Sequence, residues 1–168
     1  MMFAVKRITH SKHNHQNHKT SPEMKTSTDL ATHTAKRIEA RFIRKIEQFR
    51  NDEIRLVMLD RVESHSVACV NWAEYPYAPK VTFRVAHSDD ALAVMFEVEE
   101  EHLRAVAMSG EENVWEDSCV EFFVESPAAE GYFNFEVNCI GTMLAAHRQS
   151  RTEATLFNAE QMSKIRLF

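Results

Sequence analysis

The chain has 168 residues, 44% of them hydrophobic, which is enough for one domain with a substantial core and too few for two. Its formal net charge of -5 is unevenly distributed: residues 1–50 carry eleven Lys and Arg against four Asp and Glu, a net +7, whereas the remainder carries nine against twenty-one, a net -12. An acidic body repels a phosphate backbone, so the composition argues against nucleic acid as a partner.

Residues 1–34 are polar, basic and rich in histidine. Such a composition buries little apolar surface and predicts a disordered leader. The cluster His-Asn-His-Gln-Asn-His at 13–18 has spacings that fit no rigid metal site, so we expect no specific metal binding there. The start lacks the apolar stretch of a secretory signal and no segment is long enough to span a bilayer, which predicts a cytoplasmic protein without a transmembrane segment.

An amphipathic helix is predicted over residues 35–58. Between residues 35 and 50 the apolar residues recur at intervals of three and four, at Ile38, Phe42, Ile46 and Phe49. The polar face of this helix is mostly basic, so it suits a membrane surface or a partner protein. The alternative is that its apolar stripe packs on the domain or on another copy of the chain.

Residues 59–168 contain one short apolar segment after another, separated by turns. Val81, Phe83 and Val85 alternate with polar or small residues, as do Leu92, Val94, Phe96 and Val98, and a further short strand is expected over residues 104–108. Short strands at regular spacing predict a mainly β chain that forms an antiparallel β-sandwich of jelly-roll type.

A hairpin over residues 115–138 is the clearest pattern in the chain. Its apolar positions fall on one face, at Val120, Phe122, Val124, Phe133, Phe135 and Val137. The opposite face is mostly polar and holds Cys119, Glu121, Phe123, Glu125, Tyr132, Asn134, Glu136 and Asn138, with Trp115 in the same register. The hairpin is therefore expected to be half buried, with an aromatic ring beside carboxylates and amides on its exposed face.

That exposed face has the chemistry of a sugar site. A pyranose offers an apolar patch of C–H bonds and a rim of hydroxyl groups, so a binder needs a flat aromatic surface surrounded by hydrogen-bonding groups. The alternative is that Trp115 packs under a loop and the polar side chains form an ordinary solvated face.

Residues 59–148 resemble the family 9 carbohydrate-binding modules, and more closely the family 9-like domains of bacterial proteins linked to polysaccharide use. The specific blocks are Val-Trp-Glu-Asp-Ser-Cys-Val-Glu-Phe-Phe at 114–123 and Phe-Asn-Phe-Glu-Val-Asn-Cys-Ile-Gly-Thr at 133–142. The resemblance implies non-catalytic carbohydrate binding in the catabolism of polysaccharides such as xylan or cellulose, often in proteins that also carry glycoside hydrolases. It implies that Trp115 is a stacking ring and Glu121 a hydroxyl acceptor, with Asn134, Glu136 and Asn138 at neighbouring polar positions.

The chain departs from the family pattern in three places. The Asp117-Ser118 pair lies one residue nearer the tryptophan, and Glu136 stands where the compared module carries a cation. The second stacking tryptophan of the family comes from later strands, whereas this chain ends at Phe168 and its other tryptophan, Trp72, matches a different family position. We therefore expect an incomplete sandwich, with a site that is one-sided, completed from elsewhere, or weak.

Further expectations concern ligands and partners. No cofactor is expected, although the resemblance allows calcium, with ligands unknown. Trp72 and the turn at Tyr75 and Tyr77 form a second aromatic cluster that either extends the sugar surface or locks a loop. The family is often exported, so secretion or a periplasmic location is the alternative to the cytoplasm. An uncovered sheet edge would favour self-association.

Cys69, Cys119 and Cys139 have no C-x-x-C spacing, and their odd number does not describe a complete disulfide framework, so we expect buried free thiols. Three alternatives to sugar binding remain. One is a glycoside hydrolase that uses a pair among Glu116, Asp117, Glu121 and Glu136. Another is a haem domain with axial ligands among Met95, Met108, His87 and His147. The last is a ligand-free truncated sandwich.

Overall fold

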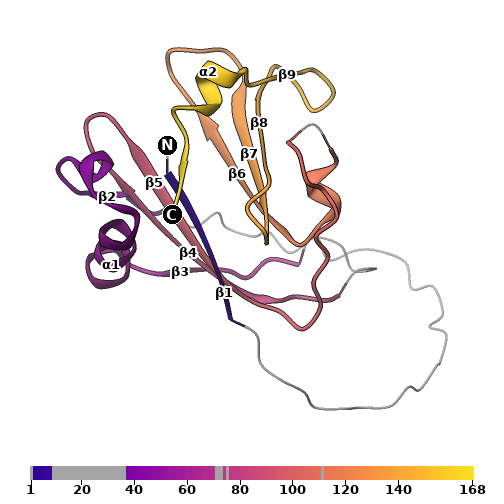
Figure 1. The fold of residues 1–168 in the computed structure, drawn as a ribbon, viewed down its shortest axis with the longest axis horizontal. Helices are drawn as coiled ribbons and strands as arrows, with labels where there is room; N and C mark the ends of the chain where they lie inside the picture. Colours follow the sequence, from indigo (N-terminus) through magenta and orange to yellow (C-terminus); the bar gives the residue numbers. More distant parts are fainter. Residues whose placement is uncertain (1, 9–36, 71–73, 75, 111) are drawn as a thin grey trace.

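Two β-sheets make up most of the fold in this computed structural model, which describes residues 2–8, 37–70, 74, 76–110 and 112–168 (Figure 1). Sheet A has the strand order β10-β1-β5-β4-β2, with β3 also paired to β4. Its strands are β1 (Met2–Ile8), β2 (Arg41–Phe42), β3 (His65–Val67), β4 (Lys80–His87), β5 (Leu92–Glu99) and β10 (Arg166–Leu167). Sheet B is an antiparallel meander in the order β6 (Cys119–Glu125), β7 (Tyr132–Asn138), β8 (Met143–Arg148) and β9 (Ala154–Leu156). The predicted mainly β sandwich is confirmed.

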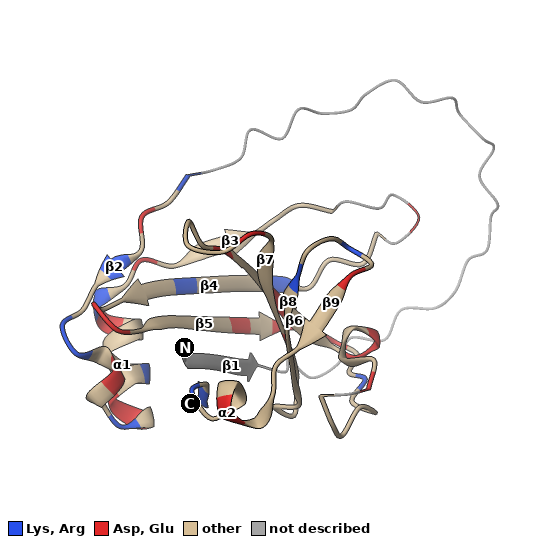
Figure 2. Ribbon diagram, turned by 90° about the horizontal axis from the view of Figure 1, so that it is seen from above, with Lys and Arg blue, Asp and Glu red and all other residues tan. Residues whose placement is uncertain are grey.

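The main core lies between the two sheets, whose strands cross in the view of Figure 2. Strand β5 contributes Val94, Phe96 and Val98 to it, and sheet B contributes Phe135 and Val137. Three partly buried residues pack against this core: Phe157, which follows β9, Met162 at the end of the short helix α2 (Ala159–Met162), and Ile165 after that helix. The alternation predicted for these strands is confirmed, because every second residue faces the opposite sheet.

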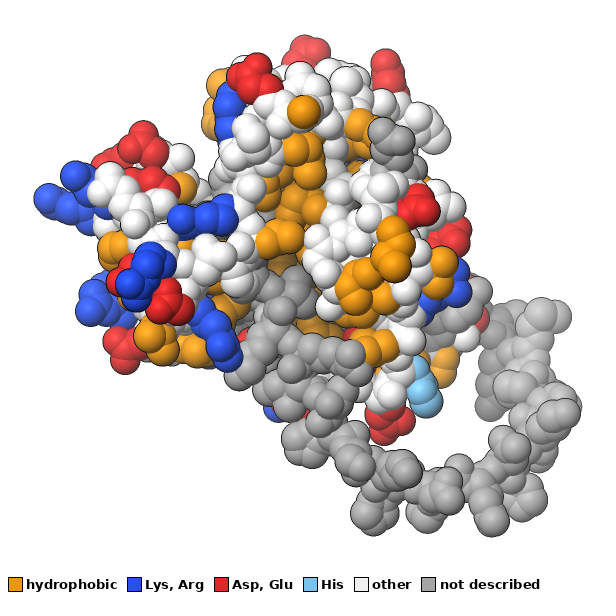
Figure 3. Space-filling model, viewed as in Figure 1, with side chains coloured by type: hydrophobic (Ala, Val, Ile, Leu, Met, Phe, Trp, Pro, Cys, Tyr) orange, Lys and Arg blue, Asp and Glu red, His pale blue; other side chains and the backbone are white. Residues whose placement is uncertain are grey.

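A second core covers the outer face of sheet A at one end. Helix α1 (Asn51–Arg61) buries Ile54 and Met58, and the 3-10 turn η1 (Ile46–Gln48) buries Ile46. They pack on Ala93 and Met95, the residues of β5 that point away from the sandwich interior. Lys and Arg side chains, with Asp and Glu among them, gather at this end of the face seen in Figure 3. Helix α1 thus packs its buried residues on the domain.

The helix predicted over residues 35–58 is wrong in its position. Lys45 has a positive φ of 56°, which no continuous α-helix accommodates. The backbone N–H of Ile43 donates to the His87 carbonyl at 2.7 Å, and the adjacent β2 pairs in parallel with β4. Tertiary strand pairing therefore overrides the local helical period before residue 50, and the helix begins at Asn51, where Asp52 and Glu53 favour its N-terminus.

The leader also differs from the prediction at its start. Residues 2–8 form β1, which lies parallel to both β5 and β10 and joins them into one sheet. The remainder of the predicted leader, including its histidines, lies outside the described residues, as do Trp72 and Tyr75. No helix in the described part of the chain is long and apolar enough to span a bilayer.

Candidate functional site

The outer face of sheet B carries the predicted polar residues. In the β6–β7 pairing, Cys119 lies opposite Asn138, Glu121 opposite Glu136, and Phe123 opposite Asn134. The third strand adds Leu144, Ala146 and Arg148 to the same face, because Met143 and Ala145 point into the sandwich core. The alternation predicted for the hairpin is therefore confirmed, and it gathers these side chains on one face.

The 3-10 turn η2 (Val114–Glu116) covers one end of this face and presents Trp115. Val114 is fully buried against Leu144 and Ala146, which fixes η2 over β6 and β7. The Trp115 side chain next to it is 48% exposed. Trp115 is therefore not a member of the hydrophobic cores, and the turn that carries it lies on the same side of sheet B as the polar residues.

The centre of the face is a polar cluster that is less exposed than predicted. Glu136 is 3% exposed and Asn134 is 2% exposed, so the expectation that both lie on a solvated face is wrong, whereas Glu121 is exposed. The Asn134 amide donates to Glu136 Oε1 at 2.7 Å, and Arg148 Nη2 lies 3.8 Å from the same oxygen. Both buried residues are on the central strand β7, which has a neighbouring strand on either side.

Two titrating groups on this face have shifted pKa values. Partial burial and the negative charge of Glu136 raise the pKa of Glu121, against the opposing effect of Arg148. Burial, followed by the charges of Glu121 and Glu136, raises the pKa of the Cys119 thiol to about 12. Both shifts are caused first by burial and then by neighbouring carboxylates.

Asn138 and Asp117 have structural roles in place of the predicted ones. Asn138 is fully buried, its amide donates to the Ala107 carbonyl and the Asp117 carboxylate, and its carbonyl oxygen accepts from the backbone N–H groups of Ile140 and Thr142. All four hydrogen-bonding positions of this side chain are used, so the prediction that it bonds a ligand is wrong.

The Asp117 side chain is 1% exposed and accepts hydrogen bonds from the backbone of Val106 and Ala107. These bonds hold residues 104–108 as an irregular segment in place of the predicted strand. Burial alone would raise the pKa of Asp117, but the hydrogen bonds from Val106, Asn138 and Ala107 hold it below its usual range. Because its oxygens already accept these hydrogen bonds, Asp117 is unsuited to act as one of the two catalytic carboxylates of a glycoside hydrolase.

The sequence analysis placed Phe123 and Tyr132 on this face but did not identify them as an aromatic pair, and it missed Arg148. Phe123, 54% exposed, and Tyr132 form an aromatic pair with ring centroids 5.9 Å apart at the end of the face away from η2. Arg148 supplies the cation of the polar cluster. Arg148 could have been found from the period-2 pattern, which puts it two residues after Ala146 on the same face.

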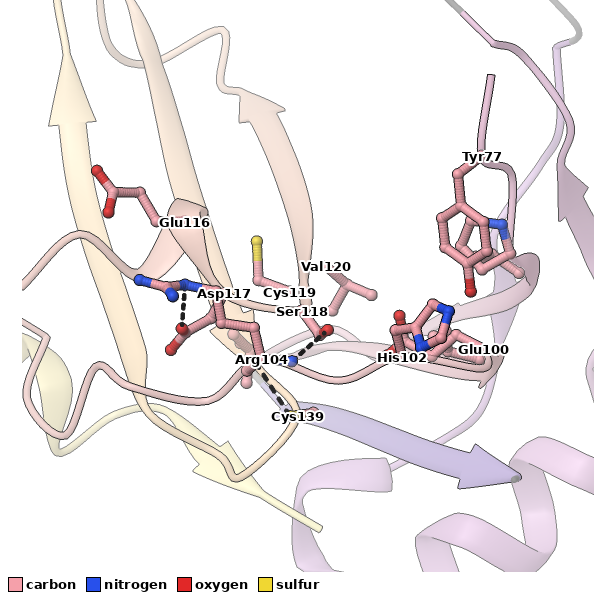
Figure 4. Close-up of a pocket in the computed structure, with 14 residues that line it drawn as sticks. Tyr77, Glu100, His102, Arg104, Glu116, Asp117, Ser118, Cys119, Val120 and Cys139 are labelled. Atoms are coloured by element: carbon pink, nitrogen blue, oxygen red, sulfur yellow. Dashed lines mark hydrogen bonds and ion pairs between the residues drawn. The ribbon is translucent and has the colours of Figure 1, made fainter. Parts of the chain in front are cut away.

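A pocket of about 350 Å³ lies beside the start of β6 (Figure 4). Tyr77, His102 and Glu100 stand on one side of it, and Glu116, Asp117 and Arg104 on the other. The Tyr77 hydroxyl accepts a hydrogen bond from the Glu101 backbone at 3.0 Å, and its ring lies 6.4 Å from that of His102. Tyr77 thus anchors its loop. This agrees with the interpretation that the second aromatic cluster locks a loop.

The three cysteines are free thiols, as predicted, but the expectation that they are buried is wrong, because Cys69 is exposed and the other two are only partly buried. Among the residues that the structure describes, no three His, Cys, Asp or Glu side chains are grouped so as to hold a metal ion. The family-based suggestion of calcium stays a prediction.

A two-sheet sandwich with aromatic and polar side chains on one outer face belongs to the class of β-sandwich binding modules. The family model of carbohydrate-binding family 9 matches residues 51–167, which is most of the chain, and the protein belongs to this family. It is thus a β-sandwich domain of carbohydrate-binding family 9.

One solved structure is similar to this chain. It is that of a candidate carbohydrate-binding protein from Bacteroides uniformis, with 31% sequence identity and a TM-score of 0.67. The similarity covers 74% of this chain and 57% of the other, so the match spans a little over half the length of the Bacteroides protein. The comparison with curated proteins finds no match.

Proposed function

We propose that the protein binds a mono- or oligosaccharide on the outer face of sheet B and does not alter it chemically. The observation that carries the proposal is the position of a half-exposed indole, Trp115, on the same side of the sheet as the cluster of Glu121, Asn134, Glu136 and Arg148. A sugar ring needs both an apolar surface and a rim of hydrogen-bonding groups, and this face offers both.

The roles follow from the order of side chains along the face. Trp115 stacks on the C–H side of a sugar ring, and the carboxylate of Glu121 accepts hydrogen bonds from its hydroxyl groups. Phe123 and Tyr132 form a second aromatic surface at the opposite end. The strand from Cys119 to Phe123 spans about 13 Å at the usual rise per residue, which is longer than one sugar ring. The two aromatic surfaces with the polar cluster between them suit a short oligosaccharide of the kind released in polysaccharide catabolism.

Isothermal titration with xylo- and cello-oligosaccharides tests the proposal. Trp115→Ala should lower affinity at least about 30-fold, because an aromatic anchor that is desolvated on binding carries much of the binding energy. Phe123→Ala should have a smaller effect on the shortest ligands and a larger one on longer ligands. Phe42→Ala is the matched control, since Phe42 is an aromatic residue of similar exposure on the other sheet.

Circular dichroism should show that all three variants keep the fold, because each removes an exposed ring. An unchanged affinity in Trp115→Ala, or equal losses in Trp115→Ala and Phe42→Ala, would contradict the proposal. Xylan and cellulose fragments serve as the first probes because the family resemblance implies polysaccharides of this type.

A further inference from the structure

The outer face of sheet B has more negative than positive charge at its centre. Glu121 and Glu136 lie directly opposite each other on neighbouring strands. Side chains in such positions are separated by about 5 Å at their Cβ atoms, and like charges there repel each other. The cation of the cluster is Arg148, whose Nη2 lies 3.8 Å from Glu136 Oε1, and Asn134 is neutral. Two carboxylates therefore share one guanidinium group.

Three buried polar atoms in this cluster have no hydrogen-bond partner among the described residues. They are Glu136 Oε2, Asn134 Oδ1 and Arg148 Nε. An unpaired carboxylate oxygen in a nearly buried side chain is unfavourable, because it has lost water without gaining a donor. Two of the three atoms are acceptors, one of them charged, so the cluster has a greater need for donors than for acceptors.

A ligand group that meets this need carries several N–H donors and a positive charge. A primary ammonium group has three donors and no acceptor, and its hydrogen bonds to carboxylates are charge-assisted. A hydroxyl group has one donor and no charge. A carboxylate on the ligand would add a third negative charge to the face. The pKa of Glu121 is raised first by its partial burial and then by the negative charge of Glu136, against the opposing effect of Arg148.

We propose that this face prefers a sugar carrying a free primary amine over the neutral parent sugar, with the ammonium group bonded to the exposed carboxylate of Glu121 and attracted by the charge of the nearly buried Glu136 opposite it. The inference rests on the proposed carbohydrate-binding function and specifies its ligand class as amino sugars and their polymers. N-acetylation removes the positive charge of the amine, so the face should not prefer the N-acetylated sugar over the neutral parent sugar. A uronic acid is repelled by the same two carboxylates.

The test compares four ligands of one ring type, glucosamine, glucose, N-acetylglucosamine and glucuronate, by NMR titration at pH 6 and low salt. The expected result is that glucosamine binds about tenfold more tightly than glucose, the gain of one charge-assisted contact. The ratio should shrink as salt rises, because salt screens the attraction. Glucuronate should bind most weakly.

Variants identify the residues responsible. Glu121→Gln and Glu136→Gln should each bring the glucosamine-to-glucose ratio close to one. Glu136 is buried, so Glu136→Gln could impair folding; in that case Glu121→Gln is the more informative variant. Glu125→Gln is the matched control, since it removes an exposed carboxylate from the same face of β6 opposite Tyr132, and it should keep the ratio.

Equal affinities for glucosamine and glucose in the wild type, or a preference for glucuronate, would overturn the inference and leave carbohydrate binding intact. A preference that survives both Glu121→Gln and Glu136→Gln would also overturn it. Failure of all four sugars and of the xylo- and cello-oligosaccharides to bind would overturn the proposed function as well.

Discussion

Asn138 donates a hydrogen bond from its side-chain amide to the carboxylate of Asp117 at 3.0 Å, and this contact joins the end of β7 to the segment that precedes β6. Both residues were expected from the sequence to serve a ligand or a reaction. Instead they hold the irregular segment at residues 104–108 against sheet B, and that segment supplies Ala107 to the small core under η2. The position of Trp115 depends on this support.

Asp117→Ala should destabilise the protein and weaken sugar binding together. The substitution leaves the buried amide of Asn138 and the backbone donors of Val106 and Ala107 without their acceptor. Thermal unfolding should show a clearly lower Tm than in Asp89→Ala, which alters an exposed turn residue.

The pKa of Asp117 is lowered, so the stability it contributes is present above its ordinary value of 3.8 and is lost as the pH falls below it. The difference in Tm between wild type and Asp117→Ala should therefore narrow in acid. Equal Tm values for Asp117→Ala and Asp89→Ala at pH 7 would contradict the structural role.

Glu121→Gln should stabilise the protein at neutral pH. The folded state raises the pKa of Glu121, so the ionised carboxylate disfavours folding, and the benefit of the substitution appears as the pH rises above the ordinary glutamate value of 4.5. Glu121 is exposed, so the gain is at most about 1 kcal/mol and shrinks with salt. Urea unfolding at pH 4 and pH 7 measures it, and a variant less stable than wild type at pH 7 would contradict the expected repulsion.

Gly110→Ala should be more destabilising than Gly141→Ala. A Cβ at Gly110 would lie 2.1 Å from the backbone oxygen of Met143, so the segment before η2 would have to move away from β8. Gly141 has a φ of +91° but its nearest neighbour would be the flexible Leu167 side chain at 3.7 Å, so strain of about 1–2 kcal/mol is expected there. The loss at Gly110 should exceed this, as measured by urea unfolding. A larger loss of stability in Gly141→Ala than in Gly110→Ala would mean that the backbone at Gly110 can move away from β8 at little cost.

Cys69 should react with iodoacetamide at pH 8 long before Cys119. Cys69 is exposed, whereas burial and the nearby carboxylates raise the pKa of Cys119 to about 12, which leaves about one thiol in ten thousand ionised at that pH. Peptide mass spectrometry over a time course distinguishes the two sites, and Cys69→Ser should remove the fast phase. Labelling of Cys119 at the rate of Cys69 would contradict its burial.

The sequence by itself determined the sandwich and the composition of its faces. Alternation has a period of two in a strand, so the apolar set of Val120, Phe122 and Val124 had to face a core, and Glu121 with its neighbours had to face the other side. This local rule does not depend on partners, which is why the hairpin prediction is confirmed. The family resemblance rested on the same two strands.

Tertiary structure decided everything that depends on what a segment packs against. The apolar residues before Arg50 have a helical period, yet β2 pairs with β4, and the helix forms one segment later, where Ile54 and Met58 bury against sheet A. Likewise, the sequence could not distinguish Asn138 from Asn134. Both alternate outward, but a loop distant in the sequence covers one and uses all its hydrogen bonds, whereas the other is left with an unpaired oxygen. Long-range contacts set burial, and burial determines which polar groups remain for a ligand.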